Sequence, residues 1–448
     1  RMLLWLLLAL PIHDLAPVPG APRVEARLCD DVEQYRGFFT LRTGPSKHYF
    51  YWHFAARVAP ESAPTVLWLT GGPGCSSEVA LFGENGPCKV NADGASTTRN
   101  PFSWNERANL LYVDQPTGTG FSYGTGYDHD ETGVANDMFD FLQQFFEAHP
   151  ELSSNPFFIF GESYAGHYVP SIAHRVWRGN KMGEGIPLPL AGVGVGNGLT
   201  DPEVQYGFYP QMAISTNGHE PAVGTLTYSA MKLALPACLA AIRACNRANV
   251  TLSDAICAAA QAGCNMAEIA PYQLSGMNVY DMRIPCDQSA GGLCYDFSNI
   301  KAFLSRPEVL EYLGVGEDRA AWTDCNMEVN ARFQGDWMKD YQQQLPDLLA
   351  AGIRVLIYAG DQDFICNWLG NKAWTLELPW AGKAAFNGAS DQPWYARDDT
   401  GRLQHAGDVR TAKGLTFLRV YAAGHMVPMD QPAASLDMLD QFLAAKLG

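Results

Sequence analysis

Six short runs of apolar residues constrain the fold of this chain more than any other feature. They are Thr65–Leu69, Asn109–Val113, Phe157–Phe160, Ala191–Val195, Ile353–Tyr358 and Leu415–Val420. Each run is nearly continuous and ends in Gly, Asp or a turn. Strands that are buried on both faces have this character, because helices cover both sides of a parallel sheet. The sequence therefore predicts an α/β fold around a central, largely parallel mixed sheet.

The segments between these runs complete the expected architecture. Val134–Ala148 has the apolar spacing of a helix that packs against the sheet. Residues 200–325 differ from the rest, because they contain seven cysteines and few strand-like runs. We interpret them as an inserted, disulfide-rich cap. It would separate a first part of the core, residues 29–199, from a second part, residues 326–448.

Charge and cysteine content limit the partners and the compartment. The formal net charge of −16 argues against nucleic acid or anionic membranes as partners, since both attract clustered Lys and Arg. Eleven cysteines without C-x-x-C pairs favour disulfides in an oxidising compartment over a zinc site. We therefore expect no metal. No nucleotide-binding motif is found, and we expect no cofactor.

The beginning of the chain and one tripeptide also indicate export. Residues 1–28 read as a signal or pro-segment leader, because the apolar run Met2–Leu10 has the length of a secretory signal core. No other stretch is judged apolar enough to span a bilayer, so we expect no membrane span in the mature chain. Asn249 stands in an N-x-T sequon and is a candidate glycosylation site.

The segment after the third apolar run contains a candidate nucleophile. The sequence Gly161-Glu162-Ser163-Tyr164-Ala165 leads from a strand through a tight turn into a helix that is expected to begin around Ser163. Such a turn holds a serine hydroxyl out of the end of a sheet. Its fifth residue is Ala, where the strict G-x-S-x-G pattern has Gly. A hydroxyl nucleophile needs a base, and the base needs a carboxylate that orients it.

Two later strand ends supply candidates for the acid and the base. Asp361 and Asp363 follow the fifth apolar run, and spacing alone does not choose between them. His425 follows the sixth run. The order Ser, Asp, His is that of α/β-hydrolases. His167 is a rival base, but it lies one helical turn beyond Ser163 on the same helix and would have difficulty facing the hydroxyl.

An oxyanion hole would complete this chemistry. The loop Trp68–Cys75 follows the first apolar run and contains the adjacent glycines Gly71 and Gly72. Glycines let a backbone N–H approach a reacting oxygen closely. The N–H of Tyr164, the residue after the candidate nucleophile, would be the second donor. Loss of one such donor costs about 100- to 1000-fold in rate.

These residues resemble a known family, the serine carboxypeptidases, which form a branch of the α/β-hydrolases, and within it the carboxypeptidase Y branch. The matching stretches are WLTGGPGCSS at 68–77, VDQP at 113–116, GESYAGHYVP at 161–170, GNGLTDP at 196–202, DFICNWLGNKAW at 363–374 and GHMVP at 424–428. They occur in the family's order over residues 29–448. The resemblance implies an α/β-hydrolase fold. It also implies release of C-terminal amino acids from peptides and proteins, through an acyl-enzyme and at acidic pH.

The resemblance implies roles for individual residues. It makes Ser163, Asp363 and His425 the catalytic triad. It makes the N–H groups of Gly72 and Tyr164 the oxyanion hole. The orienting carboxylate is thereby implied to be the second of the two candidate aspartates.

The resemblance also implies a site for the terminal carboxylate of the substrate. Glu84 and Glu162 would bind it, with Trp68 and Thr70 alongside. Two close carboxyls cannot both ionise readily, so one keeps a proton and can donate it to another carboxylate. The family's commonest residue at the position of Thr70 is Asn, so we expect weaker carboxylate recognition here.

The resemblance also implies an apolar substrate pocket. Such a pocket favours substrates with bulky hydrophobic residues beside the cleaved bond. Its candidate residues are Leu199, Tyr206, Tyr209, Tyr280, Trp337, Ile365, Cys366 and Met426. Five disulfides are also implied: Cys75–Cys325, Cys238–Cys264, Cys245–Cys257, Cys286–Cys294 and Cys29–Cys88. These pairs leave Cys366 as a free thiol near the site, where mercurial reagents are expected to inhibit.

Two other functions stay open at this point. The first is an acyltransferase or esterase on the same scaffold, and the second is a protective partner of another hydrolase. The partners that we expect are peptide and protein C-termini. The chain is expected to be a monomer or homodimer of the secretory pathway, either vacuolar or lysosomal or extracellular.

Overall fold

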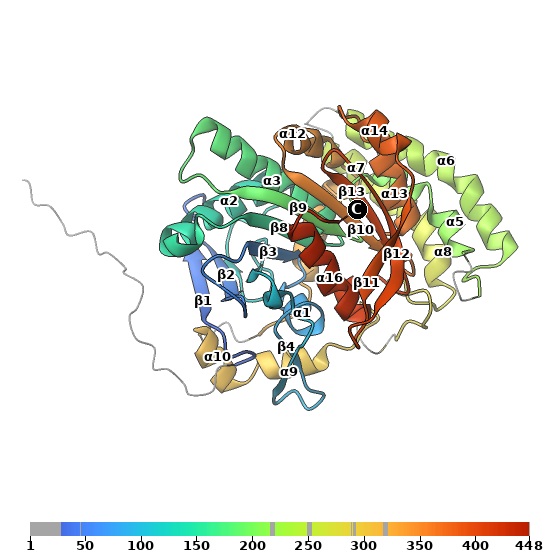
Figure 1. Ribbon diagram of the computed structural model, residues 1–448. Coiled ribbons are helices and arrows are strands. Elements are labelled where there is room, and N and C mark those ends of the chain that lie inside the picture. Colours follow the sequence, from blue (N-terminus) through green and yellow to red (C-terminus); the bar gives the residue numbers. More distant parts are fainter. Residues whose placement is uncertain are drawn as a thin grey trace, which may run out of the picture.

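One sheet runs through the molecule and carries helices on both of its faces (Figure 1). The computed structural model describes residues 28–447 except for residues 45, 216–219, 249–252, 288, 290–292 and 317–320. Residues 1–27 of the expected leader and the sequon at Asn249 lie outside the described residues.

The strands of the described chain belong to one large sheet and one small one. They are β1 (Gln34–Thr40), β2 (Lys47–Phe54), β3 (Thr65–Thr70), β4 (Cys88–Val90), β5 (Thr97–Arg99), β6 (Asn109–Val113), β7 (Tyr123–Gly124), β8 (Phe157–Glu162), β9 (Leu190–Gly196), β10 (Arg354–Gly360), β11 (Gln392–Arg397), β12 (Leu403–Ala412) and β13 (Leu415–Val420). The six apolar runs correspond to β3, β6, β8, β9, β10 and β13. Strands β4 and β5 form the small sheet.

The large sheet has the order β1-β2-β6-β3-β8-β9-β10-β13-β12-β11, with β7 paired to β2. The six central strands, from β6 to β13, pair in parallel. The strands outside them pair antiparallel at both edges. This arrangement confirms the predicted central, largely parallel mixed sheet.

Successive residues of the central strands enter two different cores, one on each face of the sheet. In β3, Val66 and Trp68 belong to one core, and Leu67 and Leu69 belong to the other. Helices cover both cores, so every side chain of such a strand is buried. The near-continuous apolar runs in the sequence have this cause.

The helices follow the same order along the chain. They are α1 (Glu78–Gly83), α2 (Glu131–Ala148), α3 (Ala165–Met182), α4 (Pro202–Tyr206), α5 (Tyr209–Ala213), α6 (Thr225–Arg247), α7 (Ser253–Cys264), α8 (Ala270–Gln273), α9 (Ser298–Leu304), α10 (Pro307–Leu313), α11 (Met327–Arg332), α12 (Leu345–Ala350), α13 (Trp368–Glu377), α14 (Lys383–Gly388), α15 (Val427–Asp430) and α16 (Pro432–Leu443). Helices α2 and α3 pack on one face of the sheet, and α1 and α16 pack on the other.

The segment interpreted as a cap packs in two separate places. Helices α4 to α8 form a third apolar core beside the carboxyl ends of the sheet strands. Helices α9 and α10 instead pack beside α1 and β4, on the opposite side of the ribbon (Figure 1). The boundaries 29–199, 200–325 and 326–448 stay a prediction.

Helix α6 is the long outer helix of the cap (Figure 1). It is long and apolar enough to cross a membrane by length and composition alone, which contradicts the expectation that no such stretch follows the leader. Its inner face, with Met231, Leu235 and Ile242, is buried. The disulfides Cys238–Cys264 and Cys245–Cys257 join α6 to α7. We therefore interpret α6 as a cap helix.

Five disulfides join the described cysteines in the pairs that the resemblance implied. They are Cys29–Cys88, Cys75–Cys325, Cys238–Cys264, Cys245–Cys257 and Cys286–Cys294. Cys366 carries a free, buried thiol. Disulfides of this number are typical of proteins that mature in the secretory pathway.

Two leucines of equal size provide a test of the packing. Leu111 in β6 is 0% exposed, and Leu233 in α6 is 85% exposed. We expect Leu111→Ala to lower the free energy of unfolding by about 2–5 kcal/mol, because it removes buried methyl groups and leaves a cavity. Leu233→Ala is the matched control and should change it by less than about 0.5 kcal/mol. Denaturant titration measures both, and equal losses would contradict the placement of these strands and helices.

Candidate active site

Ser163 occupies a sharp turn between the end of β8 and the start of α3. Its φ of +67° lies in the left-handed region, which is unfavourable for a residue with a side chain. Three backbone hydrogen bonds hold this conformation: the Ser163 N–H donates to Gly196 O, and its carbonyl accepts from Gly166 N–H and Leu199 N–H. Helix α3 begins at Ala165, two residues later than expected.

Small residues allow neighbouring backbone segments of the same chain to approach this turn. A Cβ atom on Gly71 would lie 2.4 Å from the backbone nitrogen of Tyr164, and one on Gly161 would lie 2.6 Å from the Cβ of Ala165. Any side chain at either position would force the backbone apart. The loop after β3 is therefore in direct contact with the residue that follows Ser163.

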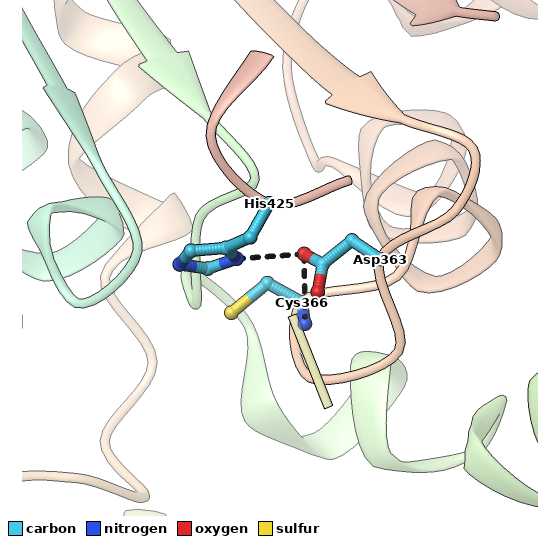
Figure 2. A group of neighbouring side chains, drawn as sticks. All are labelled: Asp363, Cys366 and His425. Atoms are coloured by element: carbon cyan, nitrogen blue, oxygen red, sulfur yellow. Dashed lines mark hydrogen bonds and ion pairs between the residues drawn. The ribbon is translucent and has the colours of Figure 1, made fainter. Parts of the chain in front are cut away.

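His425 and Asp363 form a hydrogen-bonded pair at the ends of two neighbouring strands. His425 Nδ1 lies 2.8 Å from Asp363 Oδ2 (Figure 2). Asp363 follows β10 and His425 follows β13, and these strands pair in parallel. The Asp363 carboxylate is fully buried and also accepts hydrogen bonds from the Asn197 amide and from the backbone N–H groups of Ile365 and Cys366. These contacts fix the orientation of the carboxylate that holds the imidazole.

The rival acid is occupied elsewhere. Asp361 accepts hydrogen bonds from the Arg419 guanidinium at 2.9 Å and from the backbone N–H of Ala422. It therefore stabilises the strand end and the turn before His425. The structure gives the imidazole contact to Asp363.

The rival base, His167, also contacts a carboxylate outside the cavity that contains Ser163. His167 is buried, and its Nδ1 lies 3.2 Å from Asp336 Oδ2. The same carboxylate accepts hydrogen bonds from the hydroxyls of Tyr164 and Tyr341. His167 thus belongs to a buried network that joins α3 to Asp336, whereas Ser163 lines the cavity described next.

A cavity of about 530 Å³ is lined by both the candidate nucleophile and the candidate base. Its lining includes Thr70, Gly72, Glu84, Glu162, Ser163, Tyr280, Trp337, His425 and Met426. Among the described residues, no hydrogen bond joins the Ser163 hydroxyl to the His425 ring in this structure. Catalytic hydrogen bonds are often long in free enzymes and shorten when substrate binds. The structure thus brings nucleophile and base to one cavity without closing their contact.

The candidate oxyanion donors come from two adjoining segments, since Gly72 follows the glycine that approaches Tyr164, and Tyr164 follows Ser163. Gly72 has a φ of +110°, which glycine adopts without strain, and its carbonyl accepts a hydrogen bond from the Asn330 amide at 3.1 Å. Tyr164 precedes the first residue of α3, so its N–H lies at the positive end of the helix dipole. Its hydroxyl donates to Asp336 at 2.7 Å and anchors the residue from below.

Two buried glutamates stand at the wall of the same cavity. Glu162 ends β8, and Glu84 directly follows α1. Burial raises the pKa of Glu162 well above its ordinary value, and the nearby charge of Glu84 raises it further. Burial likewise raises the pKa of Glu84. The two carboxyl groups interact with each other, and both residues line the cavity.

Trp68 and Thr70 form a polar contact beside these glutamates. The indole Nε1–H of Trp68 donates to the Thr70 hydroxyl at 3.1 Å. Both residues are buried, and Thr70 lines the cavity. The hydroxyl of Thr70 already accepts one hydrogen bond and can donate its own proton to an oxygen in the cavity.

A second, smaller hollow also has Ser163 in its lining and shares Gly72, Tyr280 and Trp337 with the cavity. Its lining is mainly apolar and aromatic: Gly72, Ser163, Tyr164, Leu199, Tyr206, Tyr209, Ile269, Tyr280, Trp337, Ile365 and Cys366. Ile269, from the segment interpreted as a cap, was not among the predicted pocket residues. Burial and the charge of Asp363 raise the pKa of the Cys366 thiol well above its ordinary value. The sulfur of Cys366 points away from the Asp363 carboxylate (Figure 2).

Two functional residues had no role in the sequence analysis. Asn197 donates from Nδ2 to Asp363 Oδ2 at 2.8 Å, and its Oδ1 accepts from the Gly360 N–H, so it joins the ends of β9 and β10. Asp336 anchors Tyr164. The position of Asn197 directly after a core strand was a usable signal, since strand ends carry functional groups in parallel sheets. Asp336 gave no comparable signal.

Two groups of side chains have ligand atoms close enough to consider a metal. They are Asp363 with Cys366 and His425, and Glu131 with His167 and Asp336. In the first, Asp363 already accepts four hydrogen bonds. In the second, Asp336 accepts from two tyrosine hydroxyls and lies 3.5 Å from the Lys339 ammonium. Protein donors thus bind Asp363 and Asp336, whereas both oxygens of Glu131 have no hydrogen-bond partner among the described residues.

A family model described as serine carboxypeptidase matches residues 22–445. Serine carboxypeptidase-like 48 of Arabidopsis thaliana is 42% identical over 432 residues, which cover 96% of this chain and 80% of that protein. Carboxypeptidase Y homolog A of Leptosphaeria maculans is 42% identical over 418 residues, 93% of this chain and 74% of that protein. The crystal structure of Kex1(delta)p, a prohormone-processing carboxypeptidase from Saccharomyces cerevisiae, superimposes with a TM-score of 0.80 at 27% identity and covers 92% of both chains.

Exchange of each aspartate for asparagine distinguishes the two acids. Asp363→Asn should lower kcat for hydrolysis by about 10,000-fold, because an amide N–H that donates to His425 Nδ1 selects the wrong tautomer of the imidazole. Asp361→Asn should lower kcat by less than about 10-fold, since that carboxylate contacts Arg419 and not the imidazole. Steady-state kinetics on folded protein measures both, and a larger loss in Asp361→Asn would reverse the assignment.

Proposed function

The chain belongs to the serine carboxypeptidase family, and we propose that Ser163, Asp363 and His425 form the triad with which it removes C-terminal residues from peptides. The observation that carries this proposal is the His425–Asp363 hydrogen bond at the cavity that contains Ser163. The Ser163 hydroxyl attacks the scissile carbonyl while His425 takes its proton. Asp363 holds the imidazole and stabilises its charged form.

The remaining steps follow the chemistry of acyl transfer. The N–H groups of Gly72 and Tyr164 stabilise the oxyanion of the tetrahedral intermediate. His425 then gives its proton to the leaving amine, which departs as the free C-terminal amino acid, and an acyl-enzyme remains on Ser163. Water, activated by His425, attacks this ester and releases the shortened peptide.

The buried glutamates account for the choice of a chain end. A terminal carboxylate would be repelled by two ionised glutamates, but it accepts a hydrogen bond from a protonated one. Glu84 and Glu162 have raised pKa values and both line the cavity that contains Ser163, which supports this role. Thr70, held by Trp68, would supply a further donor. Its reach is shorter than that of an asparagine amide, so we expect modest affinity for the carboxylate.

The cavity and the smaller hollow, which both have Ser163 in their lining, would select the side chains that flank the cleaved bond. The smaller one is lined by Leu199, Tyr206, Tyr209, Tyr280, Trp337, Ile365 and Cys366, and Met426 lines the larger one. Aromatic and aliphatic linings favour bulky hydrophobic residues. The free thiol of Cys366 lines this pocket and would make it sensitive to mercurial reagents, which bind sulfur and displace its proton.

Release of amino acids at acidic pH suits a vacuolar, lysosomal or extracellular enzyme. The five disulfides support maturation in the secretory pathway. The glutamate pair also distinguishes the carboxypeptidase from the alternatives. Cleavage at a chain end needs a site for a free carboxylate, which esterase or acyltransferase chemistry by itself does not.

A peptide with and without its terminal charge tests the proposal directly. We expect a blocked dipeptide with a free carboxylate to lose its C-terminal residue, and the matching amide to react at least about 100-fold more slowly, because it lacks the charged group that the pair binds. Amino-acid release over time measures the difference. Ser163→Ala is the control and should abolish release, together with labelling by an organophosphate. Release that persists in Ser163→Ala would refute the proposed triad.

The pH dependence should reveal the shared proton. The raised pKa values keep the pair protonated in acid, so the donor is present at low pH and is lost as pH rises through the titration of the pair. We expect kcat/KM for peptide hydrolysis to fall as pH rises through about 7, the pKa to which burial raises Glu84. In Glu162→Gln, the amide donates at every pH, so the decline should become shallower. A variant with an unchanged pH profile would exclude Glu162 from this role.

A further inference from the structure

A short segment of the cap lies between the loops that carry Asp363 and His425. We call this segment, residues 278–283, the clip. It is closed on itself, because the Asn278 N–H donates to Ile284 O at 3.0 Å. The Cys286–Cys294 disulfide follows it directly. The clip is therefore a defined loop that the cap inserts beside the catalytic groups.

On one side, the clip is bonded to the loop that carries Asp363. The Val279 carbonyl accepts from the N–H groups of Phe364 and Ile365 at 3.1 and 3.0 Å, and the Met282 N–H donates to Gln362 O at 2.9 Å. These backbone bonds come from the residues immediately before and after the aspartate. The clip thus follows the loop as a short additional strand would.

On the other side, the clip is bonded to the turn that carries His425. The His425 N–H donates to the Tyr280 carbonyl at 2.7 Å. The approach is so close that a Cβ atom on Gly424 would lie 2.5 Å from the same oxygen. The two loops therefore bond to adjacent residues of one segment.

Arg283, the last residue of the clip, adds a side-chain contact on both flanks of the His425 turn. Its Nη1 donates to Ala422 O at 2.8 Å, before the histidine, and its Nη2 lies 2.9 Å from Asp430 Oδ2, after it. Asp430 Oδ2 in turn accepts the N–H of Gly424 at 2.6 Å. Asp281 holds the guanidinium itself through two hydrogen bonds, at 2.8 and 2.7 Å.

This set of contacts requires the shape of a guanidinium. Arginine presents five N–H donors in a rigid plane, so it can bind a carboxylate with two of them and direct the others elsewhere. Lysine has one nitrogen and cannot reach Asp281, Asp430 and Ala422 O in the same way. The carboxylates are 6% and 16% exposed, so their pairing with Arg283 is only partly screened by water.

We propose that Arg283 is a positioning residue for His425. It fixes the turn from Ala422 to Asp430 against the clip, and thereby aims the imidazole at Ser163 and keeps it on Asp363. The inference rests on the proposed function of the triad. It assigns to the cap a part in catalysis that is separate from the binding of substrate side chains.

The test compares the chemical step with substrate binding in the full chain. In Arg283→Gln we expect kcat on a blocked dipeptide to fall by about 10- to 100-fold, because a shift of about 1 Å in a catalytic group has an effect of this size. KM should change by less than about 3-fold, since Arg283 does not line the cavity. The rate of inactivation by a small organophosphate should fall in parallel, because that reaction uses His425 but no substrate pocket. All rates are expressed per titrated Ser163.

Further variants separate positioning from folding. Arg283→Lys keeps the charge and should lose less kcat than Arg283→Gln. Arg243→Gln is the matched control, because Arg243 also forms a cap ion pair, with Glu203 at 3.0 Å, but it touches neither catalytic loop. Its kcat should stay within about 2-fold.

Asp430→Asn keeps an oxygen for the Gly424 N–H but removes the charge that faces Arg283, so it tests the proposal even if Arg283→Gln does not fold. It should lower kcat by about 10-fold. The Arg283→Gln/Asp430→Asn double variant should be no worse than Arg283→Gln alone. Unchanged kcat per active site in the single variants, or losses that multiply in the double variant, would overturn the inference. Activity in Ser163→Ala would instead overturn the proposed function.

Discussion

The parallel pairing of β10 with β9 on one side and β13 on the other is the constraint on which the active site depends. It brings the carboxyl ends of three strands to one edge of the sheet. Asn197, Asp363 and His425 follow these ends and meet in a single hydrogen-bonded group. The residues are far apart in the chain, so no local propensity could hold them together. Strand β8 delivers Ser163 to the same edge through its pairing with β9.

Much of this arrangement could be predicted from the sequence, because burial on both faces leaves a strong pattern. The six apolar runs located the parallel strands to within two residues at each end. The antiparallel strands β11 and β12 were not predicted, because they lie at the edge and their alternating or polar residues are partly exposed. The cap was predicted as one unit, but its apolar helices join two different cores. Periodicity identifies an apolar face without indicating which core it contacts.

The site shows the same division. Strand-end placement pointed to Ser163 and His425, whereas spacing left Asp361 and Asp363 open and only the family resemblance implied Asp363. The physical reason is the contact of Asp361 with Arg419, a residue on a neighbouring strand. The roles of Arg283 and Asp336 depend on contacts over more than a hundred residues of sequence. Such pairs carry no local signal. The electrostatics of Glu84 and Glu162 likewise result from burial, which is a property of the folded state.

The pairing of β9 with β10 has a consequence for biosynthesis. Residues 197–353 separate the two strands, and at about 5–20 residues per second a ribosome needs roughly 10–30 s to synthesise them. During that interval the half-sheet from β1 to β9 can already form, while the outer edge of β9 remains unpaired. An apolar strand with free N–H and C=O groups is a template for association with other chains. The segment between β9 and β10, which lines much of the hollow beside Ser163, therefore also prolongs the period in which the nascent chain needs protection by chaperones.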